Sequence, residues 1–304
     1  SGDLWQLRYD RFCESFEHPV RDWCHEHDVM YTGEKPSLRL AQMQYMDLPG
    51  CDAGHASAGQ PEHMMRGALR GTPRAPASAA YLYGKPAANC ECGHSLGWDA
   101  TLQDLKLICE RLLLLGVTHL IPHAFFYSTH GLRKFDAPPS FFFQMPWWPL
   151  FHKLAQHIDR IGQAFLHSHI DAKVLLVDAN PGLPTSEDLT FSGRLQEMLT
   201  AIHRDYLMID TDSLQNATIE EGRICVRDLR ADLILVPRMQ QMEPALEQSL
   251  RACEAAGGRV IRCTAESDLN SLRQQMLDAL PPSLQLDTET GDAEQVWMVT
   301  RRRG

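Results

Sequence analysis

Residues 86–127 constrain the fold of this chain more than any other stretch, because strand, loop, helix and strand patterns follow one another without interruption. Small residues at 87–91 end on the carboxylate of Glu91, and a loop rich in Gly, His and Trp follows. Apolar residues three to four apart over 102–115 predict a helix, and 117–123 reads as a buried strand. A helix between two such strands predicts a parallel sheet.

The carboxyl ends of the predicted strands carry polar side chains. The two strands above end on Glu91 and His123, and two earlier strand-like segments end on Glu34 and Asp52. In parallel α/β proteins this edge of the sheet is where binding and catalytic groups are placed. The sequence therefore predicts an active-site rim.

The first 170 residues are expected to form part of a barrel. Strands are predicted at 28–34, 44–52, 87–91 and 117–123, and helices near 4–25, 77–83, 102–115 and 150–169. A closed (β/α)8 barrel has eight strands. Residues 1–170 are therefore predicted to be half of a TIM-type barrel.

A second α/β domain is expected over residues 171–283. Strands are predicted at 173–178, 206–210, 223–226, 233–237 and 259–263, and helices at 194–204, 243–256 and 268–280. Their order predicts a doubly wound sheet. The segment has no glycine-rich dinucleotide fingerprint, phosphate loop or nucleophile elbow, so nothing in it demands catalysis.

The carboxyl end is expected to begin a third unit, a β domain over residues 284–304. Residues 286–300 read as a strand with its approach, and no partner strand for it follows. A single strand is not stable alone, so the sequence predicts the start of a truncated β-sandwich.

Composition excludes several classes of partner. The net charge of −10 argues against a nucleic-acid ligand, and no apolar run is long enough to span a membrane. Nine cysteines without a dense pattern of paired spacings indicate reduced, buried thiols, which leans toward a cytoplasmic protein. We expect a soluble globular protein.

Several motifs carry a resemblance to known enzymes. They are YTGEKPS, QYMDLPGCDAGH, KPAANCECGHSLGW, and GVTHLIPHAFFYS followed by DAPPS. Together they resemble the second half of the catalytic barrel in large multidomain glycoside hydrolases, and above all the α-L-rhamnosidase-like enzymes of family 106 and their relatives. The resemblance implies a following flavodoxin- or amidotransferase-like α/β domain, as in family 42 β-galactosidases, and then β-sandwiches. It implies a glycoside or oligosaccharide substrate, and a homo-oligomer formed through the α/β domain.

Glycoside hydrolysis needs two carboxyl groups, one to protonate the leaving oxygen and one to attack or to activate water. The resemblance places a functional glutamate at the end of the seventh barrel strand, which makes Glu91 the nucleophile or general base. Glu34, two strands earlier and in the same inward layer, is expected to be a second acid, a hydroxyl ligand or a calcium ligand. No other cofactor is expected. The alternative for each residue is a strand-end carboxylate bound to backbone N–H groups.

Substrate contacts are expected from polar and aromatic residues near these carboxylates. The candidates are Asp52, His55, His94, Trp98, His123 and Tyr127. Histidines bond ring hydroxyls, and an indole face stacks on the apolar face of a pyranose. Any of the histidines is alternatively a satisfied core residue.

The Cys90-x-Cys92-x-His94 spacing raises the alternative of a zinc site. Strand alternation argues against it, because both cysteines then project away from Glu91 and toward the helices, where they behave as small apolar residues. No metal site is therefore predicted there.

Residues 128–149 form an irregular segment with three consecutive Phe and two Trp. This density of aromatic side chains indicates either a surface for sugars or a plug that seals the end of the core.

Two function classes remain open. The first is a glycosidase, present as a fragment that is inactive alone because half of the barrel is missing. The second is a non-catalytic carbohydrate-binding or oligomerisation module of a larger glycan-degrading enzyme.

Overall fold

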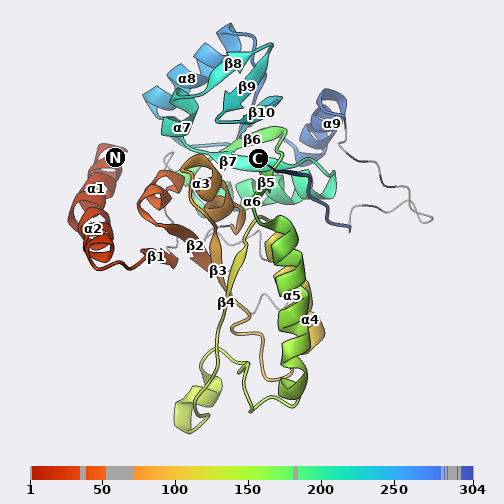
Figure 1. Ribbon diagram of the computed structural model, residues 1–304. Coiled ribbons are helices and arrows are strands. Elements are labelled where there is room, and N and C mark those ends of the chain that lie inside the picture. The colour runs from red at the N-terminus through yellow and green to blue at the C-terminus, as the bar shows by residue number, and fades with distance from the viewer. Residues whose placement is uncertain are drawn as a thin grey trace.

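The computed structural model describes residues 2–34, 39–52, 72–180, 184–281, 284, 286, 293 and 296–303. It contains two parallel sheets, one on each side of the predicted boundary near residue 170 (Figure 1). The division into domains at 1–170, 171–283 and 284–304 stays a prediction.

The first sheet has four parallel strands in sequence order. They are β1 (Thr32–Glu34), β2 (Leu48–Asp52), β3 (Asn89–Cys92) and β4 (His119–Pro122). Strands β1, β2 and β4 lie inside predicted segments, and β3 extends one residue beyond the predicted 87–91. Residues 44–45 belong to a 3-10 helix rather than to the strand predicted at 44–52. Parallel strands that follow one another in space as in sequence are those of a partial TIM-barrel-like sheet.

Helices precede, connect and follow the strands of this sheet. They are α1 (Gly2–Phe12), the π-helical η1 (Cys13–Glu17), α2 (His18–Glu26), the 3-10 helix η2 (Leu40–Tyr45), α3 (Arg74–Leu82), α4 (Leu102–Leu114), the 3-10 helices η5 (Gly131–Phe135) and η6 (Trp148–Leu150), and α5 (Phe151–Phe165). The helix predicted at 4–25 is thus interrupted by a π-helical turn. The helix predicted at 150–169 ends at Phe165, because the chain turns there into a short strand, β5 (Ser168–Ile170).

Helix α4 shows how the sequence determines the start of an element. The Thr101 hydroxyl accepts a hydrogen bond from the Asp104 backbone N–H, and the Asp104 carboxylate accepts one from the Thr101 N–H. This reciprocal capping box satisfies two donors that a helix start otherwise leaves unpaired. The apolar side of α4, with Ile108 and Leu112, packs on the cysteines of β2 and β3.

The second sheet is also parallel, with the order β12-β11-β6-β7. Its strands are β6 (Val174–Val177), β7 (Tyr206–Ile209), β11 (Leu233–Val236) and β12 (Val260–Arg262), and its helices are α6 (Ser186–Ala201), α7 (Thr211–Gln215), α8 (Pro244–Ala255) and α9 (Leu269–Ala279). Apolar clusters lie on both faces, one including α8 and the other including α6 and α9. Helices on both faces of a parallel sheet are the doubly wound arrangement predicted.

A small antiparallel sheet in this region was not predicted. Its order is β10-β9-β8, formed by β8 (Thr218–Glu220), β9 (Arg223–Val226) and β10 (Leu229–Ala231). Only 223–226 was expected as a strand, because the two neighbouring strands are too short to show an alternating pattern.

The described part of the strand predicted at 286–300 is not a strand, whereas the β domain at 284–304 stays a prediction. Residues 296–300 are not a strand, and β13 (Arg301–Arg303) pairs antiparallel with β5. The backbone of Asp171 and the side chain of Arg302 reinforce this pairing: Asp171 N–H donates to Thr300 O at 2.9 Å, and Arg302 Nη2 lies 2.9 Å from Asp171 Oδ1. The end of the described chain is therefore held at the junction between the two sheets.

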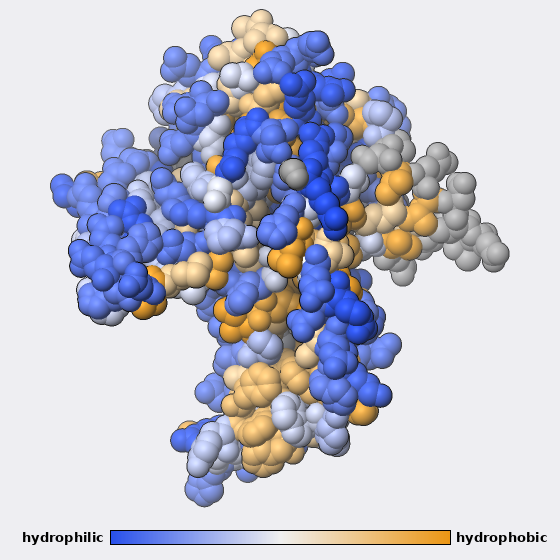
Figure 2. Space-filling model, viewed as in Figure 1, coloured by the Kyte–Doolittle hydropathy of each residue, from blue (hydrophilic) through white to orange (hydrophobic). Residues whose placement is uncertain are grey.

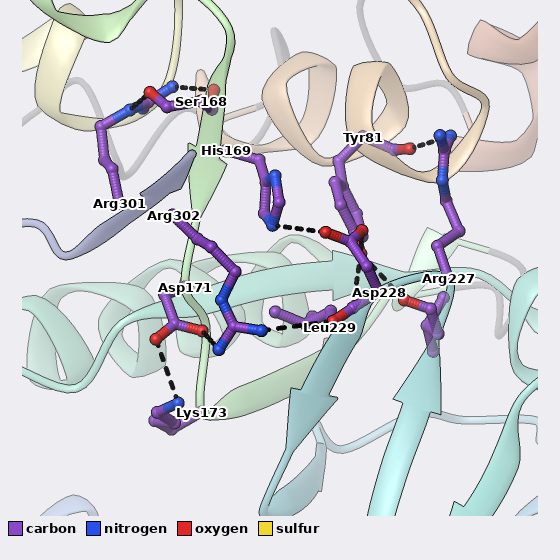
Figure 3. Close-up of polar contacts among 11 residues, drawn as sticks. Tyr81, Ser168, His169, Asp171, Lys173, Arg227, Asp228, Leu229, Arg301 and Arg302 are labelled. Atoms are coloured by element: carbon purple, nitrogen blue, oxygen red, sulfur yellow. Dashed lines mark hydrogen bonds and ion pairs between the residues drawn. The ribbon is translucent and has the colours of Figure 1, made fainter. Parts of the chain in front are cut away.

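Figure 3 shows the polar contacts that surround this junction. The Tyr81 hydroxyl donates to Asp228 Oδ1 at 2.8 Å, and His169 Nε2 lies 3.3 Å from Asp228 Oδ2. Burial lowers the pKa of His169, while the neighbouring Asp228 carboxylate acts in the opposite direction. Helix α3, strand β5 and the β9–β10 turn thus meet at one carboxylate.

The surface is mostly polar, with apolar side chains gathered on the lower projection of the molecule, around the loop that follows β4 (Figure 2). Within the described ranges, none of the helices combines the length and the apolar character that a membrane crossing requires.

Candidate functional site

The inner face of the first sheet carries the predicted site residues. Residues paired across parallel strands point to the same face, and side chains alternate between faces along each strand. One row across the sheet is Glu34, Gly50, Asn89 and His119, and the next row toward the carboxyl ends is Asp52, Glu91 and Ile121. Both rows lie on the face turned away from α4.

Glu91 and Glu34 share this face but not a row. Glu91 is half-buried and lies one row nearer the carboxyl edge, whereas Glu34 is exposed at the end of β1. Successive rows are separated by two residues, or roughly 6.6 Å along the strand. Because the register of a barrel is staggered from strand to strand, this offset does not decide whether the two carboxylates share a layer, and their role as a catalytic pair stays a prediction.

Asp52 and His94 form a buried pair beside Glu91. His94 Nε2 lies 2.6 Å from Asp52 Oδ1, and each residue is only 4% exposed. The structure thus brings together two residues that the sequence suggested separately. Asp52 ends β2 and His94 stands in the loop after β3, so the pair holds that loop against the neighbouring strand.

The loop that contains His94 needs unusual backbone conformations. Gly93, Ser95 and Gly97 have φ values of 85°, 60° and 98°, in the left-handed region that favours glycine. A Cβ on Gly93 would overlap the Phe141 ring. The alternation of glycines in this loop therefore serves both its shape and its close contact with the segment after β4.

His123 and Trp98 join the pair through a series of ring contacts. The His94 and His123 rings meet edge to face with centroids 5.8 Å apart, His123 meets Phe126 at 6.5 Å, and Phe126 meets Trp98 at 6.0 Å. The buried Nδ1 of His123 has no hydrogen-bond partner in the described structure.

The two remaining predicted substrate contacts are Tyr127 and His55. Tyr127 follows Phe126 and is 91% exposed, so its ring faces solvent. His55 lies outside the described residues.

Cysteines of the first sheet face the helices, as strand alternation predicts. Cys51, Cys90 and Cys92 are buried together with the apolar side of α4. Burial and the neighbouring Cys51 thiol raise the pKa of Cys90, and a hydrogen bond with Cys109 together with burial raises the pKa of Cys92. Thiols held neutral in this way are poor metal ligands.

Across the ranges that the structure describes, no three His, Cys, Asp or Glu side chains are grouped closely enough to hold a metal ion. His94, the third residue of the zinc alternative, is instead engaged with Asp52.

Asn89 is a site residue that the sequence reasoning missed. It is buried on the inner face, its amide donates to Leu48 O at 3.1 Å, and it also contacts the Thr32 hydroxyl. It thereby links β1, β2 and β3 directly below Glu91. A polar residue two positions before Glu91, and so on the same face, was the signal that could have identified it.

Two cavities lined by described residues lie away from the candidate catalytic residues. One cavity of about 450 Å³ lies on the opposite side of the sheet, between β4, α4 and α5, and is lined mainly by apolar residues. Another of about 390 Å³ lies at the carboxyl ends of β6 and β7, where Asp178 and Asp210 are found. Neither cavity includes Glu34, Glu91 or the Asp52–His94 pair.

No family model matches the sequence, and no curated protein matches it. Among solved structures, the rhamnosidase from Novosphingobium sp. PP1Y is similar with a TM-score of 0.63 and 17% identity, over 83% of this chain and 25% of the rhamnosidase. A β-galactosidase from Bacillus circulans sp. alkalophilus is similar with a TM-score of 0.62 and 12% identity, over 86% of this chain and 40% of that enzyme. The GH42 β-galactosidase Gan42B is similar with a TM-score of 0.53 and 11% identity, over 83% of this chain and 39% of Gan42B.

Identities this low establish a shared fold and nothing finer. The chain has a fold found in glycoside hydrolases and spans between a quarter and two fifths of the length of these structures. The expected likeness to the glycoside hydrolase fold is thus confirmed, whereas membership of family 106 and an amidotransferase-like character of the second domain stay predictions.

Proposed function

We propose that this chain carries part of the active site of a glycoside hydrolase of α-L-rhamnosidase-like type, with Glu91 as the general base or nucleophile. The position of Glu91 carries the proposal. It is half-buried on the inner face at the carboxyl edge of the sheet, beside the Asp52–His94 pair and with Asn89 in the row below. This is the edge at which barrel enzymes assemble their catalytic groups.

Each neighbour has a physical task in this proposal. The buried Asp52–His94 pair acts as a positioning element, because it fixes the loop after β3 without itself being open to solvent. His123, whose ring meets that of His94, is a candidate contact for a sugar hydroxyl. Glu34 serves as a second acid, as a hydroxyl ligand or as one ligand of a calcium ion.

The second candidate function is a carbohydrate-binding or oligomerisation module without catalysis. The openness of the inner face favours it, since Ile121 is 43% exposed there and His119 is also exposed. An open face lacks the dry, preorganised surroundings that make carboxylates effective catalysts. In this alternative, homo-oligomer contacts through the second domain would be the principal role.

Glu91→Gln in the longest natural form of the protein separates the two candidates. Gln keeps the size of the side chain but can neither attack nor take a proton, so kcat on aryl α-L-rhamnosides or β-galactosides should fall by several orders of magnitude. Glu220→Gln is a matched control, because Glu220 also ends a strand but lies in the small antiparallel sheet, where it pairs with Arg230. Turnover that survives Glu91→Gln would remove Glu91 from the mechanism and favour the binding module.

The 304-residue chain by itself should show no turnover above background on the same substrates. The four strands of the first sheet that the structure describes do not close an eight-strand barrel, so we expect the inner face of the isolated chain to stay too wet for efficient catalysis. Robust turnover that disappears in Glu34→Gln would instead make Glu34 and Glu91 a self-sufficient pair.

A further inference from the structure

The loop after β3 contains a Gly-x-Ser-x-Gly sequence, GHSLG at residues 93–97, with Ser95 at its centre. It lies between strand β3 and helix α4. In acyl-transfer enzymes this motif places a serine nucleophile on a strained turn that leads from a strand to a helix. The turn is longer here than in those enzymes, because α4 begins only at Leu102.

Ser95 has the backbone conformation that such a turn requires. Its φ is 60°, a left-handed value that is uncommon outside glycine and that is found preferentially at functional sites. Two backbone bonds hold the loop around it: Ser95 N–H donates to Ala137 O at 3.2 Å, and Gly97 N–H donates to Pro138 O at 3.1 Å. The segment after β4 therefore fixes the serine in this conformation.

The side chain of Ser95 contacts a buried base, which in turn contacts a buried carboxylate. The Ser95 hydroxyl lies 3.1 Å from His94 Nδ1, and His94 Nε2 lies 2.6 Å from Asp52 Oδ1. Ser95 is half-buried, whereas His94 and Asp52 are each 4% exposed. The Asp52 contact favours the tautomer with its proton on Nε2, so that Nδ1 accepts from the Ser95 hydroxyl. A nucleophile next to a base that a third group orients is the diagnostic geometry of nucleophilic catalysis.

The residue after Ser95 supplies a donor for the oxyanion of such a reaction. Among the described residues, the Leu96 N–H makes no backbone hydrogen bond, although the N–H groups of Ser95 and Gly97 on either side of it are bonded. The N–H that follows the nucleophile is a usual oxyanion donor in enzymes with this motif.

We propose that Ser95, His94 and Asp52 form a second catalytic site, one that hydrolyses small acyl esters, with O-acetylated sugars as the substrate class. Asp52 pairs with Glu91 across β2 and β3, so the site lies at the same edge of the sheet as the candidate glycosidase residue. The acyl-transfer chemistry is independent of the proposed function, and only the choice of a sugar ester rests on it.

The reaction balances with these groups and water alone. Ser95 Oγ attacks the carbonyl carbon of the ester while its proton passes to His94 Nδ1, and collapse of the tetrahedral intermediate releases the sugar hydroxyl, which takes that proton. Water, deprotonated by His94, then attacks acetyl-Ser95 and releases acetic acid, which restores the serine. Asp52 does not touch the substrate; it is a positioning residue that holds the imidazole in the required tautomer.

Reaction of the 304-residue chain with an alkyl fluorophosphonate, followed by peptide mass spectrometry, tests the nucleophile. Wild type should be labelled once, at Ser95, because this reagent modifies a serine readily only when a base activates it. Ser95→Gly suits the positive φ, so it should keep the fold and abolish the label. Ser128→Ala is the matched control, because Ser128 is half-buried in the loop after β4 and its Oγ accepts from the His130 N–H. Its labelling should equal that of wild type.

Hydrolysis of p-nitrophenyl acetate and release of acetate from an O-acetylated methyl glycoside measure turnover. Ser95→Gly should lower kcat on both by at least about a hundredfold. Asp52→Asn should lower kcat by at least about tenfold and leave KM within about twofold of wild type, because Asp52 contacts His94 rather than the substrate.

Three results would overturn parts of the proposal. Absence of a label on Ser95, or turnover that survives Ser95→Gly, would exclude the second site. An unchanged kcat in Asp52→Asn would show that the Asp52–His94 contact only braces the loop. Hydrolysis of p-nitrophenyl acetate without release of acetate from the glycoside would retain the acyl transfer and exclude the sugar ester. Failure of the proposed function would appear instead as glycoside turnover that is insensitive to Glu91→Gln.

Discussion

Gly50 offers a sharp test of the inner face of the first sheet, because a single methyl group at this position has no room. Gly50 lies in β2 between Glu34 and Asn89, and an added Cβ would overlap the Asn89 amide oxygen and the Gly33 carbonyl oxygen. The amide could rotate away, but the carbonyl belongs to the backbone of β1. Gly50→Ala therefore forces β1 and β2 apart at the row that contains Glu34.

The expected loss of stability in Gly50→Ala depends on which atoms must move to make room for the methyl group. Overpacking of a well-packed interior costs about 1 to 3 kcal/mol, and a rigid backbone partner places Gly50→Ala at about 2 to 3 kcal/mol. Cys51 and Cys90 are 2% and 0% exposed and report opening of this sheet when they react with a thiol reagent. If labelling requires the sheet to open, a loss of about 2 to 3 kcal/mol in the free energy of opening makes thiol labelling about 30- to 150-fold faster.

Gly33→Ala is the control for this experiment, because a Cβ on Gly33 meets nothing within 4 Å. Its labelling rate should equal the wild-type rate or fall slightly, since Gly→Ala also reduces the freedom of the unfolded chain. Mass spectrometry of the labelled peptides gives both rates in one experiment. Labelling of Gly50→Ala within threefold of wild type, or equal acceleration in Gly33→Ala, would refute the close approach of β1, β2 and β3.

Two further predictions concern buried carboxylates. Burial raises the pKa of Asp178 from 3.8 to about 6. The folded state therefore binds this proton more tightly than the unfolded state does. The resulting contribution to stability, up to about 3 kcal/mol, is present below pH 4 and is lost as the pH rises through 6. Asp178→Asn should flatten the pH dependence of urea unfolding between pH 4 and 6, and an unchanged slope would contradict it. For the pair of Asp52 and His94, single Ala variants should each destabilise by about 1 to 3 kcal/mol, whereas the double variant should cost clearly less than their sum. Strict additivity would show that the contact is not a stabilising interaction.

The regular parts of the fold could be predicted because their patterns are local. The four strands of the first sheet and the four of the second all overlap predicted segments, and only β3 extends beyond its segment, by one residue. The Thr101–Asp104 spacing marked the start of α4 correctly. The errors arose where contacts between segments far apart in the sequence determine the secondary structure. β5 and β13 are each three residues long and form only because they pair with each other.

The candidate site could be predicted in composition but not in arrangement. Strand parity placed Glu91 on the inner face and the cysteines on the helix side. The contact between Asp52 and His94 could not be read from the sequence, because it depends on left-handed residues in a loop and on the lateral position of β2. Register across a sheet is likewise a tertiary property, so the offset of one row between Glu34 and Glu91 could not be read from the sequence.

Helix α3 covers an edge of the second sheet from the other side of the predicted boundary near residue 170. Strand β7 is an edge strand, and edges with unpaired N–H groups need cover. The Met208 N–H donates to the Ser78 hydroxyl of α3 at 2.9 Å, and Ala75 and Ala79 pack against Met208 in one apolar cluster. Small residues in α3 allow this close approach. Removal of residues 1–170 would therefore expose an edge of the second sheet, so that the part after residue 170 depends on α3 for a complete surface.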